Sequence, residues 1–284
     1  MTVLTIDEVI GKVHDLPSLP VVVTEMLNAI GKENVDVKTL ADKVSRDQAL
    51  TAKTLRLANS SFYGLQHKIT TIQQAIAVIG FQSVRTLITA AAVTGSIAID
   101  GKSSFNFPAF WRHSLATAVC ARSLARHVHV DPEYAFMAGL LHDIGRLVLV
   151  TCFLEKYEKT LDCRNQSDCY LFEAEQSVLG VDHSMVGSAL ARHWKFPLVM
   201  EKAVASHHEP DALETGSLAA VVHVADAIAH ALDLSEDPTD LVPPLSDAAW
   251  DNLGLPEARV METLGETEIQ FEEACQVLVG DTAG

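Results

Sequence analysis

The second half of the sequence holds seven side chains of the types that bind metal ions, each inside or beside a mostly apolar stretch. They are His113, His142, Asp143, His183, His207, His208 and Asp226. The stretch AFMAGLLHDIGRLVLV, residues 135–150, is typical: it predicts a buried helix, yet it contains His142, Asp143 and Arg146. A buried imidazole or carboxylate without a partner is costly, so we expect these groups to meet one another or a cation.

Imidazole and carboxylate together are the ligands of borderline and harder divalent metals. Because the set contains no cysteine, it disfavours Cu(I) and structural zinc and favours Fe, Mn, Zn or Ni in a hydrolytic centre. We expect two divalent transition metal ions of undetermined identity, with Asp143 as the shared carboxylate. The predicted partition is His113, His142 and Asp226 on one ion and His183, His207 and His208 on the other.

Each residue also has an ordinary interpretation when taken alone. A single buried histidine is more often a hydrogen-bonded core residue than a ligand, and only the combined pattern favours a metal site. Arg146 has two interpretations that stay open: a structural partner of Asp143, or a cleft residue that contacts a phosphate. His223 and His230 lie near Asp226 on one predicted helix. We favour satisfied core or rim positions for both over a role in supporting the ligands.

Helix signals recur along the whole chain and strand signals do not, so the predicted fold class is all-α. In the N-terminal half the predicted helices cover residues 19–30, 37–44, 48–58, 72–79 and 82–93, with Gly80 ending the fourth. In the second half they start near 107, 132, 167, 182, 197 and 217. We therefore predict an N-terminal helical bundle over 1–106 packed on a metal-binding helical domain over 107–232. A linker and helical tail over 233–284 follow.

Composition restricts the class of protein and its partners. The 284 residues are 48% hydrophobic, which predicts a folded chain with a substantial core. A formal net charge of -16 disfavours nucleic acid and an anionic membrane as partners, because the long-range field repels both. The five cysteines form no C-x-x-C pair, and the first twelve residues do not resemble a signal peptide. We expect a cytoplasmic protein.

The order of the predicted ligands resembles that of a known superfamily. His113, the His142–Asp143 pair and Asp226 resemble the HD metal-dependent phosphohydrolases, all-helical proteins in which these residue types hold a metal. His183, His207 and His208 resemble the second-metal ligands of the HD-GYP cyclic di-GMP phosphodiesterases. The N-terminal stretches LPSLPVVVTEML, LADKVSRDQALTAKTLRLANSSFYG and ITTIQQAIAVIGFQSVRTLI are similar to the HDOD family, the HD-related output domain of bacterial signalling proteins. This resemblance covers residues 16–232.

The resemblance implies a signal-transduction protein with an HD-like domain over 107–232 and a retained two-metal site. Its expected partner is another signalling protein or a small phosphorylated ligand. A second reading is an active phosphohydrolase on a nucleotide or cyclic nucleotide, with Asp143 and Arg146 as catalytic residues. A third is a metal-free interaction module. The chain departs from HD-GYP enzymes because HHEPDALETGS lacks a Gly-Tyr-Pro motif and because Arg146 stands where lysine is usual.

Overall fold

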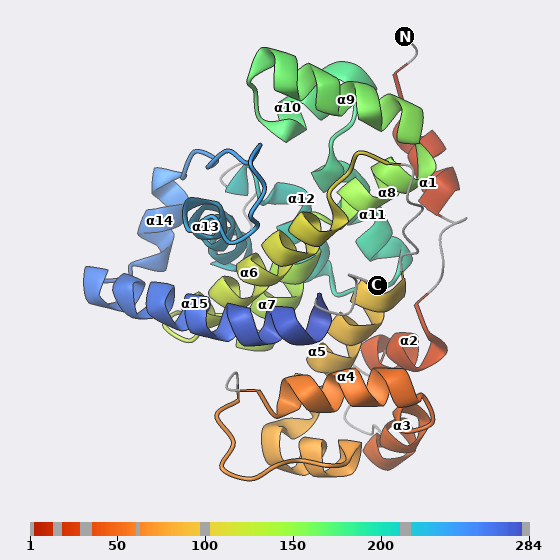
Figure 1. Cartoon of the computed structure of the whole chain (residues 1–284), viewed down its shortest axis with the longest axis vertical. Coiled ribbons are helices and arrows are strands. Elements are labelled where there is room, and N and C mark those ends of the chain that lie inside the picture. Colours follow the sequence, from red (N-terminus) through yellow and green to blue (C-terminus); the bar gives the residue numbers. More distant parts are fainter. Residues whose placement is uncertain are drawn as a thin grey trace. The chain divides into compact units, whose positions relative to one another are not determined.

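A computed structural model describes residues 3–13, 19–28, 36–60, 63–96, 103–210 and 217–279, and within these ranges the chain is helical with no strand, which confirms the predicted all-α class (Figure 1). The helices of the first hundred residues are α1 (Ile6–Val13), α2 (Val21–Asn28), α3 (Val37–Val44), α4 (Gln48–Ala58) and α5 (Ile72–Ser96). The next group is α6 (Phe107–Ala125), α7 (Pro132–Leu141), α8 (Ile144–Cys152), α9 (Leu154–Ser167) and α10 (Leu171–Leu179). The last group is α11 (His183–His193), α12 (Leu198–Ser206), α13 (Ser217–Ala231), α14 (Asp247–Leu253) and α15 (Glu257–Leu278).

The chain forms two compact units, and each is made of two segments. One unit contains Met1–Leu16 and Ile99–Leu264, and the other contains Pro17–Ala98 and Gly265–Gly284. This division differs from the predicted boundaries at 106 and 232. Residues before Pro17 join the later unit because the Leu4 N–H donates to the Leu179 carbonyl at 2.6 Å and α1 packs on α11. The predicted tail also divides, since α15 begins in one unit and ends in the other.

In the unit that contains Pro17–Ala98, helices α2, α3 and α4 pack against α5. Gly80, at φ 84° and ψ 159°, interrupts α5 where the sequence predicts a helix end. The predicted bounds of α3 and α4 match the structure, and Asp36 and Asp47 cap their first turns through side-chain hydrogen bonds. The predicted helix from residue 19 is described only as far as Asn28, because residues 29 and 30 lie outside the described ranges.

In the unit that contains Ile99–Leu264, α6 is the central helix. Helices α7 and α13 both pack on it, so nearly every α6 side chain is buried, His113 among them. Helix α11 packs on α8, on α12 and on α1, and α12 also contacts α7 and α13. His142, at the end of α7, thereby lies near His113 of α6, and His183 and His207, at the ends of α11 and α12, lie near Asp143 before α8.

Two predicted helices in this unit differ from the structure. The helix that contains residues 135–150 is broken into α7 and α8, with His142 and Asp143 at the break. The helix predicted to start at Ser167 starts instead at Leu171, because Ser167 is the last residue of α9. Helix α9 was not predicted from the sequence. Asp168 adopts a left-handed conformation at φ 48° and ends α9. The Tyr170 N–H then donates to Glu173 at 3.1 Å in the first turn of α10.

Two apolar stretches, Ile72–Thr94 and Pro132–Cys152, are long enough to cross a membrane. However, 56% and 83% of their most apolar windows are buried inside the protein. Core helices of soluble proteins meet the same criteria of length and composition. The two stretches are therefore weak evidence for a membrane-spanning segment.

Candidate metal centre

The structure brings all seven predicted ligands together within one unit. Their potential ligand atoms form two groups, each with its members within 4.8 Å of one another: Asp143, His183, His207 and His208 in one, and His113, His142 and Asp226 in the other. These are the two sets that the sequence predicts, with Asp143 in the first of them. His208 is part-buried and the other six are buried.

Glycines at helix crossings allow these ligands to approach one another. A Cβ atom on Gly145 of α8 would lie 2.0 Å from the His183 carbonyl oxygen, and one on Gly139 of α7 would lie 2.8 Å from the Ala118 Cα of α6. Such distances are far below van der Waals contact, so only glycine permits either crossing. The close approach of α8 to α11 brings His183 to Asp143, and the approach of α7 to α6 brings His142 to His113.

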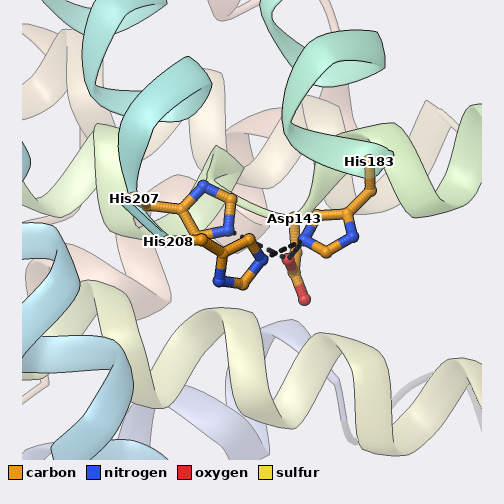
Figure 2. Close-up of side chains that lie close together, drawn as sticks. All are labelled: Asp143, His183, His207 and His208. Carbon is orange, nitrogen blue, oxygen red and sulfur yellow. Dashed lines mark hydrogen bonds and ion pairs between the residues drawn. The ribbon is translucent and has the colours of Figure 1, made fainter. Parts of the chain in front are cut away.

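In the first group, imidazole rings surround the Asp143 carboxylate (Figure 2). Its Oδ1 lies 3.0 Å from His183 Nε2 and 3.7 Å from His207 Nε2. His208 Nε2 lies 2.7 Å from His183 Nε2. The same Oδ1 is 3.7 Å from Nε2 of His142, a member of the second group, so Asp143 faces both groups.

In the second group, Asp226 on α13 faces histidines from two other elements. Its Oδ1 lies 2.9 Å from His113 Nε2 and 3.3 Å from His142 Nε2, and these two nitrogens are 3.2 Å apart. Yet Asp226 Oδ1 is buried and has no partner with hydrogen-bond geometry. A carboxylate oxygen in contact with nitrogens but without hydrogen bonds needs another explanation.

The partners of Nδ1 in three of the histidine rings provide this explanation. His142 Nδ1 lies 2.6 Å from the Gly139 carbonyl oxygen and His207 Nδ1 lies 2.8 Å from the Val204 carbonyl oxygen. A carbonyl only accepts, so each Nδ1 carries a hydrogen and, in the neutral ring, each Nε2 presents a lone pair. His183 is held in the same way by the Glu175 carboxylate, at 2.6 Å from Nδ1. In the neutral form of these rings, the Nε2 lone pairs face carboxylate oxygens and repel them. A proton or a cation between nitrogen and oxygen removes this repulsion, so the residues fit a metal.

The two carboxylates and His208 have charges that suit cation binding. Burial would raise the pKa of Asp143, but the adjacent histidines, His142 foremost, hold it well below the ordinary value. The pKa of Asp226 is likewise well below the ordinary value despite burial, mainly because of His230. Burial lowers the pKa of His208 well below that of a free histidine. Ionised carboxylates and a neutral imidazole are the forms that bind a metal.

A pocket in the same unit reaches both groups, and its wall includes His113, Asp143, His183, His208 and Asp226. Arg146 also lies in this wall. Its Nη1 donates to Asp143 Oδ2 at 2.8 Å, and its guanidinium carbon lies 5.4 Å and 5.6 Å from the Phe105 and Phe110 ring centroids. Both interpretations of Arg146 therefore agree with its position, since it pairs with Asp143 and also lies in the pocket wall.

Two functional candidates were missed from the sequence: Glu175 and Asp240. Glu175 is buried in α10 and contacts both the Nδ1 and the backbone N–H of His183. A glutamate within an apolar helix was the available signal. His230, for which the sequence favours a core or rim position, is 15% exposed and lies between Asp226 and Asp240.

His223 is the satisfied core residue that the sequence favours. Its Nδ1 lies 2.7 Å from the His207 carbonyl oxygen, and its Nε2 accepts from the Ser246 N–H at 2.9 Å. Both ring nitrogens therefore have partners. His223 holds the backbone of a predicted ligand in place without facing the centre.

The HDOD domain matches residues 16–210, more than half of the chain. The chain belongs to the HDOD family. The crystal structure of a "putative phosphohydrolase" from Shewanella amazonensis SB2B is similar to this HDOD protein, with a TM-score of 0.77, 28% identity, and coverage of 95% of this chain and 97% of that one.

Among curated proteins, an uncharacterized protein of Treponema pallidum is 24% identical over 199 residues, which is 69% of this HDOD chain and 38% of the relative. Ribonuclease Y of Thermus thermophilus is 32% identical over 120 residues, 42% of this chain and 16% of the relative. The chain thus spans less than two fifths of the length of these relatives. The HD superfamily is metal-dependent, and this HDOD protein has a histidine and aspartate cluster that could bind a metal.

Proposed function

We propose that this protein is a cytoplasmic HDOD signalling protein that binds two divalent transition metal ions in the unit that contains Ile99–Leu264. The observation that carries the proposal is that the Nε2 atoms of His142, His183 and His207 face the Asp143 and Asp226 oxygens. The Nδ1 partners of the three rings fix this orientation. The metal is Fe, Mn, Zn or Ni, because the donors are imidazole and carboxylate only.

In this assignment Asp143 is shared by the ions, and each ion has three further ligands. His113, His142 and Asp226 hold one ion, and His183, His207 and His208 hold the other. Ions bound there would supply Lewis acidity toward a phosphoryl oxygen and toward water. The partner in signalling is a second protein, or a small phosphorylated ligand that enters the pocket lined by Asp143.

A second candidate function is a metal-dependent phosphohydrolase on a nucleotide or cyclic nucleotide. The pocket favours it, because Arg146 and Arg164 both lie in the wall near the ligands and a guanidinium binds phosphate through paired hydrogen bonds. The names of the Shewanella relative and of Ribonuclease Y agree with this class. In this role Arg146 would balance the negative charge on the reacting phosphate.

Elemental analysis of the full chain, purified without chelators from cells supplied with iron or manganese, tests the metal site. We expect about two equivalents of transition metal per chain, as a two-ion site requires. A preparation free of metal would instead support the metal-free module. Assays of the loaded protein with a phosphodiester and a phosphomonoester then separate the two candidate functions, since only a phosphohydrolase turns either over.

A further inference from the structure

His230 lies on α13 one helical turn after Asp226 and faces the same group of ligands. Its Nε2 is 3.4 Å from Asp226 Oδ1, and its ring centroid is 4.2 Å from that of His113. Only 15% of its side chain is exposed. The potential ligand atoms of His113, His230 and Asp240 also lie within 4.8 Å of one another. His230 therefore lies close enough to take part in the metal centre.

The carboxylates around His230 lie at distances similar to those around the predicted ligand His183. His183 has Nδ1 at 2.6 Å from Glu175 and Nε2 at 3.0 Å from Asp143. His230 has Nδ1 at 2.8 Å from Asp240 and Nε2 at 3.4 Å from Asp226. In each case one carboxylate lies near Nδ1 and a carboxylate of the centre lies near Nε2, although only the Nδ1 contact of His183 has hydrogen-bond geometry. Such a carboxylate near Nδ1 is the usual partner of a metal-bound histidine.

The contacts of Asp226 point to coordination rather than to an ordinary ion pair. The Nε2 atoms of His113, His142 and His230 lie 2.9, 3.3 and 3.4 Å from its Oδ1. None of the three has hydrogen-bond geometry toward that oxygen. Nitrogens that crowd an oxygen without hydrogen-bonding to it are arranged around a common centre, as ligands are around an ion.

Asp240 reaches His230 from the loop between α13 and α14, and the loop is held at several points. Arg112 of α6 donates to Glu236 at 2.6 Å, and Arg164 of α9 donates to Thr239 Oγ1 at 2.9 Å. Asp240 itself accepts from Ser235 Oγ at 2.9 Å. His230 and this loop lie outside residues 16–210, so the family match does not include them.

We propose that His230 is a further ligand of the ion held by His113, His142 and Asp226, and that Asp240 is a positioning residue that orients the His230 ring. The proposal rests on the proposed metal centre. The proposal places one more imidazole on this ion. It also makes Asp240, which lies in the loop predicted as a linker, part of the centre.

The test uses Co²⁺ with the full chain, because its visible absorption reports the ligands and a titration reports affinity. We expect His230→Gln to bind one Co²⁺ at least tenfold more weakly and to shift the absorption bands. Asp240→Asn, which keeps an acceptor but removes the charge, should weaken the same ion about 10- to 100-fold. Asp233→Asn is the matched control: this aspartate is exposed, lies in the same loop at φ 52°, and should bind Co²⁺ as the wild type does.

Several outcomes would overturn the proposal. One is wild-type Co²⁺ affinity and spectrum in folded His230→Gln. Another is a wild type that binds three ions, with one ion lost completely in His230→Gln, which would give His230 an ion of its own. Asp240→Asn keeps the test decisive if His230→Gln does not fold, since a wild-type affinity there would remove the positioning role. A wild type that binds no Co²⁺ refutes the metal centre itself, a result distinct from the others.

Discussion

Asp143 contacts a guanidinium through one carboxylate oxygen and faces imidazole nitrogens with the other. Oδ2 accepts from Arg146, while Oδ1 lies 3.7 Å from Nε2 of both His142 and His207. His142 and His207 belong to different ligand groups. One side chain therefore connects the two groups, and its removal should affect both.

We predict that Asp143→Asn removes most of the affinity for both ions while it nearly preserves shape and volume. His113→Ala should weaken mainly one ion and His208→Ala the other, because each belongs to one group only. Metal content by elemental analysis and thermal melting of the three variants provide the check. If the cluster were purely structural, the order would reverse. Asp143→Asn would then be mild, and the two alanine variants would lose stability through cavities.

Glu175 gives the centre a pH dependence. Burial would lower the pKa of His183, but Glu175 and then Asp143 outweigh burial, so this pKa lies well above the ordinary value in the metal-free protein. A proton must then leave His183 when a metal binds, and metal affinity should rise with pH up to that raised pKa, by as much as about tenfold per unit for each proton released. Below it, protons compete for the same nitrogen.

Glu175→Gln should reduce the number of protons released, because it removes the charge that raises the His183 pKa most. It should also weaken binding about 10- to 100-fold, since the glutamine orients the ring less firmly. Calorimetric titration of the metal in two buffers with different ionisation enthalpies counts the protons. An unchanged count in Glu175→Gln would show that His183 is not the group that loses the proton.

The clustering of the seven predicted ligands could be expected from the sequence because histidine and aspartate are conspicuous in apolar helices. Glu175 and Asp240 could not, because their role depends on which ring nitrogen they reach, and that depends on helix packing. The contact of His230 with Asp240 was not predicted for the same reason. Its distance to Asp240 depends on the path of a loop, which residue spacing does not give.

At the scale of elements, the crossing of α8 and α11 sets the geometry of one ligand group. A Cβ on Gly145 would lie 2.0 Å from the His183 carbonyl oxygen and 2.7 Å from the Gly187 nitrogen. Both neighbours are backbone atoms, so they can yield only if a whole helix moves. The distance from His183 to Asp143 would then increase.

We therefore predict that Gly145→Ala lowers the free energy of unfolding by about 3 kcal/mol, the upper part of the range for overpacking. Metal affinity should fall as well, because the helix that carries His183 must shift. Gly11→Ala is the control, since a Cβ there meets nothing within 4 Å, and alanine in a helix should be neutral or slightly stabilising. Denaturant unfolding and metal titration of both variants would show whether the crossing matters.

Helix positions were predicted well where caps and glycines mark the ends, as for α3, α4 and the break at Gly80. The break between α7 and α8 was missed because residues 135–150 are continuously apolar and periodic. His142 remains close to helical at φ -54° and ψ -40°, whereas Asp143, at φ -95° and ψ 5°, leaves the helix. Local sequence gives no signal for this departure, although the side chains that it redirects are the ligands.

At the scale of the whole molecule, the final part of α15 completes the unit formed by Pro17–Ala98. Phe271 and Leu278 are 0% and 1% exposed, whereas Ile269 on the same helix is 66% exposed. The division at Gly265 was not predicted from the sequence, because Gly265 lies inside one continuous helix, α15. The part of α15 from Gly265 to Leu278 thus contributes to a core.

We predict that Phe271→Ala destabilises this unit by about 3–5 kcal/mol, the usual cost of removing a buried phenylalanine. Ile269→Ala, a similar truncation on an exposed site, should change stability by less than about 0.5 kcal/mol. Hydrogen exchange of residues 36–60 and 63–96 would locate the effect, and metal content should stay near the wild-type value because every predicted ligand lies in the other unit. Equal effects of the two substitutions would contradict this account.

The order of segments along the chain also separates in time the synthesis of the two parts of one unit. Helices α2 to α5 leave the ribosome before residues 99–264, but Phe271 and Leu278, which belong to the same unit, emerge only after residues 99–264 have been made. At about 5–20 residues per second this delay is roughly 10 to 30 s, far longer than helix formation or collapse. Throughout that interval the nascent helices expose apolar surface. This unit should therefore depend on ribosome-associated chaperones more than the unit that contains the predicted ligands, whose longer segment is continuous.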